Sequence, residues 1–402
     1  METLNLLISD ETLRDGEQQV GLFIDDKAAL AHLIAQTGVH QIAVMPGIHP
    51  SEAQLVTDLA AVGLSQVAAS TMMKRAAIDQ SKACGIQEII LFHAVSDRLL
   101  FLRDDAIAAD PTFQNKTIDD DIPAGVVQAM RQRMLDNALE HVRYAVSQGL
   151  RVCFAAEDAS RADFYFLVDC INALAPHISQ ILLCDTVGVL TPEKSFVWIH
   201  DLAEYTSAPL VVHFHNDMGL ALENAIQAVR AGAQGVSGTF GGIGERAGNV
   251  PLEQLLRGLR VRFGWEVAGI DYDALDPVTD YLHARSLRPH PPYSPQAQRH
   301  ESGVHVSSLL RDRQSYAVFP YGQPEIWFGK CSGASNLQYL FEQHLGQPLG
   351  RSQYEHLREV IKAIALEEKR SFSIDEVAAL LAEHLPQRSD YVVPPATEVD
   401  YP

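Results

Sequence analysis

The feature that most limits the fold of this chain is a repeated alternation of short apolar runs and helix-like stretches. The eight runs are, in chain order, residues 5–10, 41–46, 66–71, 88–95, 151–156, 180–185, 209–215 and 235–240. They are apolar on both faces, as parallel strands covered by helices must be. Stretches with helical spacing lie between them, at residues 25–36, 126–148, 161–174, 192–205 and 219–231. Eight such units over about 260 residues predict a (β/α)8 TIM barrel, whose usual length is roughly 250 residues. A doubly wound open sheet is the alternative.

The chain after the predicted barrel has a different composition. Residues 285–303 are rich in proline and polar side chains, which is typical of a linker or arm. Helical spacing returns over residues 351–386. We therefore expect a barrel over residues 1–275, a linker or lid subdomain over 276–335, and a small, mainly helical C-terminal domain over 336–402.

Composition narrows the class of function. The formal net charge of −20 argues against broad nucleic-acid binding, which needs a basic face. No apolar stretch reaches the ~18 residues that a membrane-spanning helix needs, and no basic segment precedes the first apolar run, so neither a membrane span nor a signal peptide is expected. The five cysteines are scattered and odd in number, which favours reduced thiols in the cytoplasm.

Polar residues follow the predicted strands where each strand ends. The carboxyl ends of the strands meet at one mouth of such a barrel, where active sites lie. Arg14 and Asp15 follow the first run, His93 lies in the fourth, Glu157 follows the fifth and Thr186 follows the sixth. An isolated surface ion pair contributes only about 0–1 kcal/mol, so a functional site explains Arg14 and Asp15 better than stability does.

The segment VVHFHND, residues 211–217, predicts a metal site. Alternate residues of a strand share a face, so His213 and His215 point the same way. Two imidazoles and a carboxylate from another strand, for which Asp15 is the natural candidate, suit a divalent metal ion. The alternative is two histidines with ordinary core hydrogen bonds. The segment GTFGGIGERAGN, residues 238–249, is either a plain tight turn or a loop whose glycines let the backbone approach a ligand.

Six motifs occur in the order and spacing of a known family: ETLRDGEQ, EDASRAD, DTVGVLTP, HFHNDMGLALENAIQAVRAGAQGV, GGIGERAGN and HESGVH. Over about residues 6 to 340 the chain resembles the isopropylmalate synthases and homocitrate synthases. These are barrel metalloenzymes that also include hydroxymethylglutaryl-CoA lyase. The resemblance implies a metal-dependent Claisen condensation of acetyl-CoA with a 2-oxo acid. Hydrolysis of the thioester then gives a 2-substituted malate.

The resemblance also implies roles for particular residues. Asp15, His213 and His215 match the metal ligands, and Asn249 matches a fourth ligand used by some members. The metal is typically Mg²⁺, Mn²⁺ or Zn²⁺, and it polarises the keto group as a Lewis acid. On the glycine-rich loop, we assign Gly242, Gly244 and Arg246 to binding of the co-substrate acetyl-CoA.

The remaining matches concern the reacting groups. Arg14 matches an arginine beside the reacting oxygen, where a fixed donor stabilises developing charge. His305 and Tyr316 match a pair brought over the site, often from the neighbouring subunit, so a homodimer with a crossing lid is expected. His305 is a credible base, and Glu157 matches the glutamate that orients or assists it. Gln18 and Thr186 match positions that contact the substrate.

The sequence departs from the family at the end of the second strand, where Ala43 replaces a glutamate of the usual catalytic set. Met45 follows on the same run, and the third run leads into Thr71, Met72 and Met73. Methionine adapts to irregular apolar ligands. We therefore expect an apolar or aromatic 2-oxo acid, such as 2-oxoisovalerate or phenylpyruvate (a benzylmalate-type synthase), and assign Met45, Thr71 and His93 to substrate binding.

Other functions remain open at this point. Lys74, Arg75 and His93 keep 2-oxoglutarate, and so a homocitrate synthase, among the alternatives. A lyase that cleaves a hydroxyacyl-CoA, or a non-catalytic metabolite-binding barrel, would be the others. Residues 97–125 form a long insertion-like loop, either a flap over the pocket or a solvated excursion. We do not expect the regulatory C-terminal domain of many isopropylmalate synthases in this chain, and Lys330 of FGKCSG has no assigned role.

Overall fold

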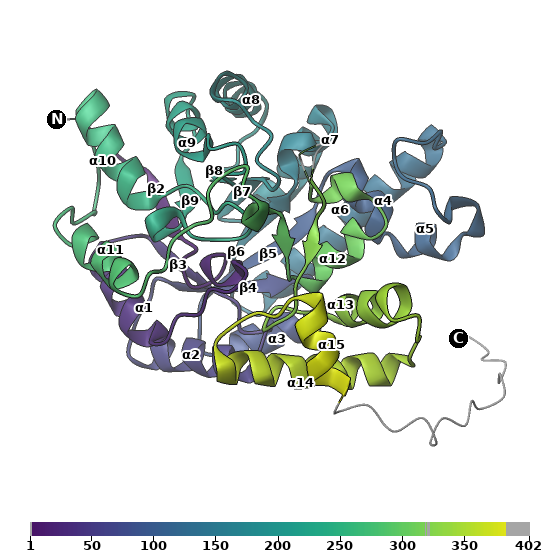
Figure 1. The fold of residues 1–402 in the computed structure, drawn as a ribbon. Helices are drawn as coiled ribbons and strands as arrows, with labels where there is room; N and C mark the ends of the chain where they lie inside the picture. The colour runs from purple at the N-terminus through teal and green to yellow at the C-terminus, as the bar shows by residue number, and fades with distance from the viewer. Residues whose placement is uncertain (1, 318, 320–321, 383–402) are drawn as a thin grey trace.

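The computed structural model describes residues 2–317, 319 and 322–382. Eight parallel strands close into a barrel in chain order (Figure 1). They are β2 (Leu7–Asp10), β3 (Gln41–Val44), β4 (Val67–Met72), β5 (Glu88–Ala94), β6 (Arg151–Glu157), β7 (Gln180–Asp185), β8 (Leu210–Phe214) and β9 (Gly235–Gly238). β2 pairs with both β3 and β9, which closes the sheet. The predicted barrel is confirmed, each predicted run overlaps one strand, and the open sheet is excluded.

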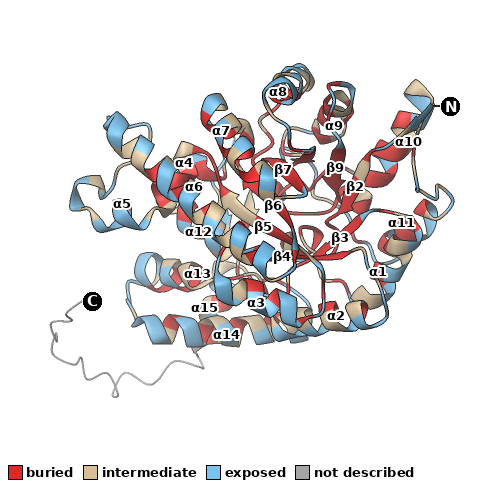
Figure 2. Ribbon diagram, turned by 180° about the vertical axis from the view of Figure 1, so that it is seen from behind, coloured by how far each residue is buried: buried red, intermediate tan, exposed pale blue. Residues whose placement is uncertain are grey.

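Helices surround the barrel. The outer layer contains α1 (Lys27–Gln36), α2 (Pro50–Ala61), α3 (Arg75–Ala83), α6 (Ala124–Ser147), α7 (Phe164–Leu174), α8 (Pro192–Tyr205), α9 (Ala221–Arg230) and α10 (Leu252–Phe263). Figure 2 shows buried strands at the centre and exposed outward faces on these helices. α8 begins with a local sequence signal for a helix start: the Thr191 side chain accepts a hydrogen bond from Lys194 N, and Pro192 is the first residue of the helix.

The barrel interior is apolar and built largely from small side chains. Its inward-facing cluster comprises Ala43, Ala68, Ile90, Cys153, Ala155, Leu182, Cys184 and Val211. Layers of inward side chains fill barrels of this kind, so the interior is a packed core and not a pore. Ala43 is completely buried in this cluster. The position where the family usually has a glutamate is therefore part of an apolar floor beneath the mouth.

Residues 97–125 are not a structureless loop. They contain α4 (Asp97–Arg103), α5 (Asp105–Ala109) and a 3₁₀ turn (Pro111–Phe113). The Ser96 side chain caps α4 by accepting from Leu99 N, and the Asp104 side chain caps α5 by accepting from Ile107 N. α4 buries its leucines and Phe101 against the barrel core. The excursion is an ordered, packed part of the fold.

The chain beyond the barrel folds back over it. β10 (Trp265–Val267) pairs with β1 (Glu2–Leu4), and α11 (Leu275–Ala284) follows. The chain then forms β11 (Arg299–His300), α12 (Gly303–Leu309) and β12 (Glu325–Ile326). α13 (Ala334–Gln338), a π-helical turn (Tyr339–His344), α14 (Arg351–Glu368) and α15 (Ile374–Ala382) complete it.

These last helices share a second hydrophobic core, which includes Phe328, Phe341 and Phe372, and they lie beside α3 (Figures 1 and 2). A helical C-terminal region is thus confirmed. The predicted domain boundaries at residues 275 and 335 stay a prediction, and residues 383–402 of the last predicted domain lie outside the described residues. None of the described helices combines the length and the apolar character that crossing a membrane requires.

Buried ion pairs fasten the C-terminal region to the barrel mouth. The Glu17 carboxylate lies 2.5 Å from Lys330 Nζ and 2.8 Å from Lys27 Nζ, and all three side chains are largely buried. Lys330 Nζ also donates to the Leu22 carbonyl at 2.7 Å. Burial alone would raise the pKa of Glu17, but the two lysines outweigh it and lower that pKa. Lys330 of the FGKCSG segment therefore holds the C-terminal region against the loop after β2.

Replacing Lys330 tests this attachment. Lys330→Met should lower the free energy of unfolding by about 3 kcal/mol, because it removes one partner of a buried ion pair. Denaturant unfolding measures this loss. Arg75→Gln is the control, since Arg75 and Glu140 form a pair whose side chains are 60% and 56% exposed, which contributes at most about 1 kcal/mol. Equal losses in the two variants would contradict the assigned role of Lys330.

Candidate active site

A cavity of about 140 Å³ lies at the mouth of the barrel, beneath α12. Nine residues selected from the sequence line it together: Arg14, Asp15, Gln18, Met45, Glu157, Thr186, His213, His215 and His305. They come from the ends of the barrel strands, the loops that follow them, and the α12 segment. The structure thus brings most of the predicted site into one place.

Three ligand-type side chains converge in this cavity. Oδ2 of Asp15 lies 4.0 Å from Nε2 of His213 and 3.9 Å from Nε2 of His215. Burial lowers the pKa of His215 to about 3, so its ring is neutral at neutral pH. Burial alone would raise the pKa of Asp15, but the Arg14 guanidinium beside it holds that pKa well below its usual range. One carboxylate and two neutral imidazoles are a ligand set for a divalent transition metal or Mg²⁺.

The surroundings of these three residues fit a bound cation. Nδ1 of His213 is hydrogen-bonded to Ser237 Oγ at 3.1 Å, which orients the ring toward Asp15. Asn249 Nδ2 donates to Asp15 Oδ1 at 2.6 Å. Among the described residues, the buried Oδ1 of Asn249 has no hydrogen-bond partner. Such unpaired polar atoms are costly unless a ligand or water joins them. Asp15, His213 and His215 would hold the metal, with Asn249 beside them.

Gly244 allows the glycine-rich loop to reach this cluster. Its φ is +148°, and a Cβ there would lie 2.5 Å from Asp15 Oδ1 and 2.0 Å from Asn249 Nδ2. Any larger residue would displace these side chains. The following backbone amide, Glu245 N, donates to Asp15 Oδ1 at 3.1 Å. The loop therefore holds the carboxylate in place from one side.

Arg14 is held in place by Glu11, a residue for which no role was predicted from the sequence. Its Nε donates to Glu11 Oε2 at 2.6 Å, and NH1 donates to Asp15 Oδ2 at 3.0 Å. Glu11 is completely buried, whereas the Arg14 side chain is 18% exposed and faces the cavity. Glu11 lies in the same ETLRDGEQ motif as Arg14 and Asp15, and this position is the sign in the sequence that it belongs to the site. The two carboxylates hold the guanidinium beside the metal-ligand cluster.

A second group of side chains surrounds His305. Its ring stacks on Tyr316, with centroids 4.0 Å apart and an interplanar angle of 26°. The Tyr316 hydroxyl donates to Glu157 Oε1. Arg103 of α4 donates to both oxygens of Glu157, at 2.6 and 3.1 Å, and to the Tyr316 hydroxyl. Burial alone would raise the pKa of Glu157, but Arg103 lowers it to about 2. Glu157 is therefore a fixed carboxylate at neutral pH, and Arg103 is a residue of the site that the sequence reasoning missed.

Glu245 contacts the other side of the same imidazole. Nδ1 of His305 is 2.5 Å from Glu245 Oε1. Burial alone would raise the pKa of Glu245, but His305 and Arg246 bring it to about 2. Glu245 lies in the glycine-rich segment GTFGGIGERAGN, and no role was predicted for it from the sequence. A carboxylate bonded to one ring nitrogen fixes the tautomer and leaves the other nitrogen to act as a base.

Two predicted substrate contacts do not reach the cavity. Ser70 and Met72 line it, but Thr71 between them bonds to Ser81 of α3 through their hydroxyls at 2.9 Å. In the same way Phe92 lines the cavity, whereas His93 is hydrogen-bonded to the Ala94 carbonyl at 2.9 Å and is not among the lining residues. Successive side chains of a strand face opposite sides, which explains both differences.

The residues assigned to acetyl-CoA have other contacts. The Arg246 guanidinium donates to both oxygens of Asp217, at 2.7 and 3.0 Å, and to the Thr186 carbonyl at 2.5 Å. It is only 2% exposed. Gly242 accepts from Asn249 N at 3.0 Å, inside the loop. These contacts tie the glycine-rich loop to the ends of β7 and β8, and a role of Gly242, Gly244 and Arg246 in binding acetyl-CoA stays a prediction.

The lid residues lie over the barrel of their own chain. Arg161, after β6, donates to the carbonyls of Gln314 and Ser315 at 2.6 and 2.8 Å. Arg98 of α4 pairs with Asp312. The resemblance led us to expect His305 and Tyr316 from a neighbouring subunit, but these contacts bring them to the site within one chain. The expected homodimer stays a prediction.

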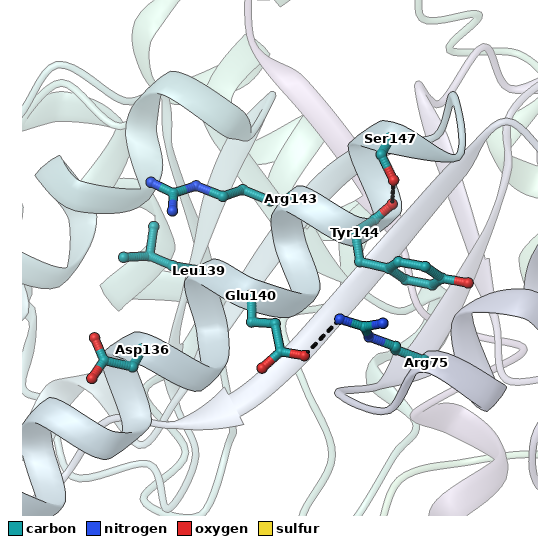
Figure 3. A pocket seen from close by; sticks show the side chains of 7 residues that line it. All are labelled: Arg75, Asp136, Leu139, Glu140, Arg143, Tyr144 and Ser147. Atoms are coloured by element: carbon teal, nitrogen blue, oxygen red, sulfur yellow. Dashed lines mark hydrogen bonds and ion pairs between the residues drawn. The ribbon is translucent and has the colours of Figure 1, made fainter.

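Another hollow lies on the outside of the barrel, between α3 and α6 (Figure 3). Arg75 pairs there with Glu140 at 2.9 Å, and the Tyr144 hydroxyl donates to Asp79 at 2.7 Å. The pair of Arg75 and Glu140 lies on exposed helix faces, and none of the predicted site residues lines this hollow. The mouth cavity remains the candidate active site.

Comparisons with known proteins support the fold and identify the family of the chain. A family model described as HMGL-like matches residues 124–280. The HMG-CoA lyase of Brucella melitensis has the same fold, with a TM-score of 0.53 and 19% identity over 71% of this chain and 99% of the lyase. Two curated relatives are similar over nearly their whole lengths. 2-Isopropylmalate synthase 2 of Caldanaerobacter subterraneus subsp. tengcongensis is 30% identical over 379 residues, covering 90% of this chain and 91% of that protein. Homocitrate synthase 1 of Nostoc sp. is 31% identical over 395 residues, covering 94% of this chain and 97% of that protein. The chain belongs to the family of 2-isopropylmalate synthases and homocitrate synthases.

Proposed function

We propose that this enzyme condenses acetyl-CoA with an apolar or aromatic 2-oxo acid and then hydrolyses the thioester, giving a 2-substituted malate and CoA. The family supports the reaction type, since its curated members here are 2-isopropylmalate, homocitrate and citramalate synthases. Candidate acceptors are 2-oxoisovalerate and phenylpyruvate. The divalent metal is Mg²⁺, Mn²⁺ or Zn²⁺, held by Asp15, His213 and His215.

The observation that carries the choice of acceptor is the apolar wall of the cavity. The metal-ligand cluster comes from the ends of β2 and β8, whereas the side chains contributed by β4, β5 and β7 are largely apolar. Those that line the cavity include Met72, Ile90, Phe92 and Leu182, and Met45 joins them after β3. A side chain of an oxo acid directed toward this wall would leave water for an apolar surface, which is favourable when that side chain is itself apolar.

The second carboxylate of 2-oxoglutarate lacks a suitable partner at this wall. Arg14 is held by Glu11 and Asp15 beside the metal-ligand cluster, where it faces the keto oxygen and not the apolar wall. Arg75 pairs with Glu140 outside the barrel, and His93 does not line the cavity. A carboxylate buried without a cation or donors carries a large desolvation cost. This supports an apolar acceptor over a homocitrate-forming reaction.

The proposed roles of the side chains follow from their contacts. A divalent metal supplies a Lewis acid beside the keto group when it is bound. Arg14 donates to the negative charge that develops on the keto oxygen as the carbon–carbon bond forms. Thr186 Oγ1 accepts from Asp158 N at 2.8 Å, so its own hydrogen is available to the substrate carboxylate. His305, held by Glu245, takes the methyl proton of acetyl-CoA. Tyr316 stacks on the imidazole of His305 and is itself held by Glu157 and Arg103, so the imidazole keeps its orientation.

A panel of 2-oxo acids tests the proposal. We expect release of the CoA thiol from acetyl-CoA with 2-oxoisovalerate or phenylpyruvate, at least tenfold faster in kcat/KM than with 2-oxoglutarate, because an unpaired buried charge costs more than ~1.4 kcal/mol. Reactions without oxo acid and with a metal chelator are the controls. Faster thiol release with 2-oxoglutarate would indicate a homocitrate synthase instead. Cleavage of a hydroxyacyl-CoA without condensation would indicate a lyase, and ligand binding without turnover would indicate a non-catalytic barrel that has lost function with Ala43.

Two further expectations remain part of the proposal. We propose a homodimer, as the family resemblance implies, and light scattering of the purified chain measures it. We also propose a cytoplasmic location. The five cysteines are free in the structure, which suits a reducing compartment.

A further inference from the structure

Two successive carboxylates of the EDASRAD segment hold Tyr316 at different points. Glu157 accepts the hydrogen bond from the Tyr316 hydroxyl. Asp158 instead binds Arg161, whose guanidinium contacts the main chain directly before Tyr316. Tyr316 is completely buried, and its ring stacks on His305. The position of this ring therefore depends on contacts both at its hydroxyl and at the main chain that carries it.

The guanidinium of Arg161 donates in two directions. Its Nε and NH2 donate to Oδ1 and Oδ2 of Asp158 at 2.7 and 2.8 Å, which is the strong bidentate geometry. NH1 donates to the Gln314 carbonyl at 2.6 Å, and NH2 also donates to the Ser315 carbonyl at 2.8 Å. These carbonyls lie in a 3₁₀ turn (Arg313–Ser315), and the last carbonyls of a helical turn lack backbone donors of their own. Arg161 supplies those donors.

Asp158 is a fixed support for this arginine. Its side chain is completely buried and accepts a further hydrogen bond from Ser96 Oγ. Its backbone amide donates to Thr186 Oγ1 at 2.8 Å. Its φ is +62°, in the left-handed region that residues other than glycine seldom adopt. Such a conformation persists only where the surrounding contacts fix it, and it is common at functional sites.

Arg161 and Asp158 act from outside the active-site cavity. Neither is among the residues that line it, and the Arg161 side chain is 22% exposed. What they hold is the segment of residues 303–316, which we call the lid segment. It carries His305 on α12 and ends at Tyr316. Any effect of Arg161 on the reaction must therefore pass through the lid segment.

We propose that Arg161 is a positioning residue for the proton transfer. Held by Asp158, it fixes the main chain before Tyr316, and the stacked Tyr316 ring then keeps the imidazole of His305 directed at the cavity. The inference rests on the proposed function, in which His305 takes the methyl proton of acetyl-CoA. It gives a residue that touches no substrate a share in the rate of that step.

Arg161→Ala should lower both kcat and the exchange of the acetyl-CoA methyl protons with D₂O by roughly 10- to 100-fold, because a displacement of about 1 Å near the reacting groups can cost about 10² in rate. KM for the oxo acid should stay unchanged, since Arg161 does not line the cavity. Arg161→Lys keeps the charge beside Asp158 but cannot reach the carboxylate and both carbonyls, so an intermediate loss is expected. Guanidinium ion, added far below denaturing concentrations, should restore part of kcat in Arg161→Ala.

The fold of Arg161→Ala should survive, because Arg98 of α4 still holds the lid segment through Asp312. Mn²⁺ should still raise its unfolding temperature, since the metal-ligand cluster is unchanged. Arg262→Ala is the matched control. Arg262 also forms a bidentate pair with a carboxylate, that of Glu223, but this pair joins the outer helices α10 and α9. This variant should keep full activity and show no response to guanidinium.

A double variant separates positioning of the base from a general loss of stability. If Arg161 acts through the imidazole, Arg161→Ala should lower kcat in the wild-type chain but not in a chain that already carries His305→Ala. Equal losses in both chains would overturn the inference. Full methyl exchange in Arg161→Ala, with exchange lost in His305→Ala, would overturn the inference alone and leave the proposed base in place. Full exchange in His305→Ala would show that the proposed base is wrong, and the inference would fail with it.

Discussion

Asp15→Asn should remove metal binding and turnover together. Asp15 supplies the only carboxylate of the predicted ligand cluster in the described structure, and its Oδ2 lies about equally far from the two imidazoles, at 4.0 and 3.9 Å. A Lewis acid beside a carbonyl contributes several kcal/mol to transition-state stabilisation, so we expect kcat to fall by roughly 10³-fold or more. The fold should survive, because asparagine has nearly the same shape and Arg14 keeps its contact with Glu11.

Thermal unfolding with and without Mn²⁺ separates metal binding from catalysis. A ligand that binds only the native state raises the unfolding temperature in a concentration-dependent way, so Mn²⁺ should stabilise the wild-type protein and leave Asp15→Asn unaffected. His213→Ala should behave like Asp15→Asn, and the double variant should lose little more, because ligands of one ion act as a unit. Asp79→Asn, which changes a carboxylate on the outer face bonded to Tyr144, is the control and should keep the Mn²⁺ effect. Undiminished stabilisation of Asp15→Asn by Mn²⁺ would contradict the cluster.

The barrel could be predicted because each of its strands carries a local signal. Runs that are apolar on both faces, separated by helical spacing, admit few arrangements other than a covered parallel sheet. The same signal contains no information on which alternate residues face inward. Thr71 and His93 were therefore assigned to substrate binding, whereas their neighbours Met72 and Phe92 are the residues that line the cavity. A strand with one polar face and one apolar face would have shown which residues point inward, but these strands are buried on both sides.

The contacts that organise the catalytic residues were beyond local reasoning. Arg103 and Glu157 are separated by 54 residues, and Glu245 and His305 by 60. Each pair forms only when distant elements meet at the barrel mouth: α4 meets the end of β6, and α12 meets the loop after β9. Arg103 also lies in residues 97–125, which were predicted as a long loop, although Ser96 just before them and Asp104 within them are both helix caps. Capping residues among many aspartates do not stand out without the packing that selects them.

His305→Ala should lower kcat by roughly 10²- to 10⁴-fold, the usual contribution of a general base. The imidazole stands between the Glu245 carboxylate and the Tyr316 ring, and its cavity-facing side shares the space of the metal-ligand cluster. Removing it should leave Mn²⁺ binding and CoA binding intact, because none of the proposed ligands of either is changed. Exchange of the acetyl-CoA methyl protons with D₂O, followed by NMR, measures the proton-transfer step directly and should be lost in the variant.

Added imidazole provides the decisive comparison for this residue. In His305→Ala the ring leaves a space beside Glu245, and a free imidazole bound there should restore part of both the turnover and the methyl exchange. The control is His141→Gln, which changes a half-buried histidine of α6 bonded to the Asn137 carbonyl and should retain full activity.

Glu245→Gln keeps a hydrogen bond to the ring but removes the charge, so a smaller loss of about 10- to 100-fold is expected. If His305→Ala exchanged methyl protons as fast as the wild-type protein, the base would have to be another group. Glu157 would then be a poor replacement, because its pair with Arg103 keeps its pKa near 2 and makes it too weak a base for a methyl proton.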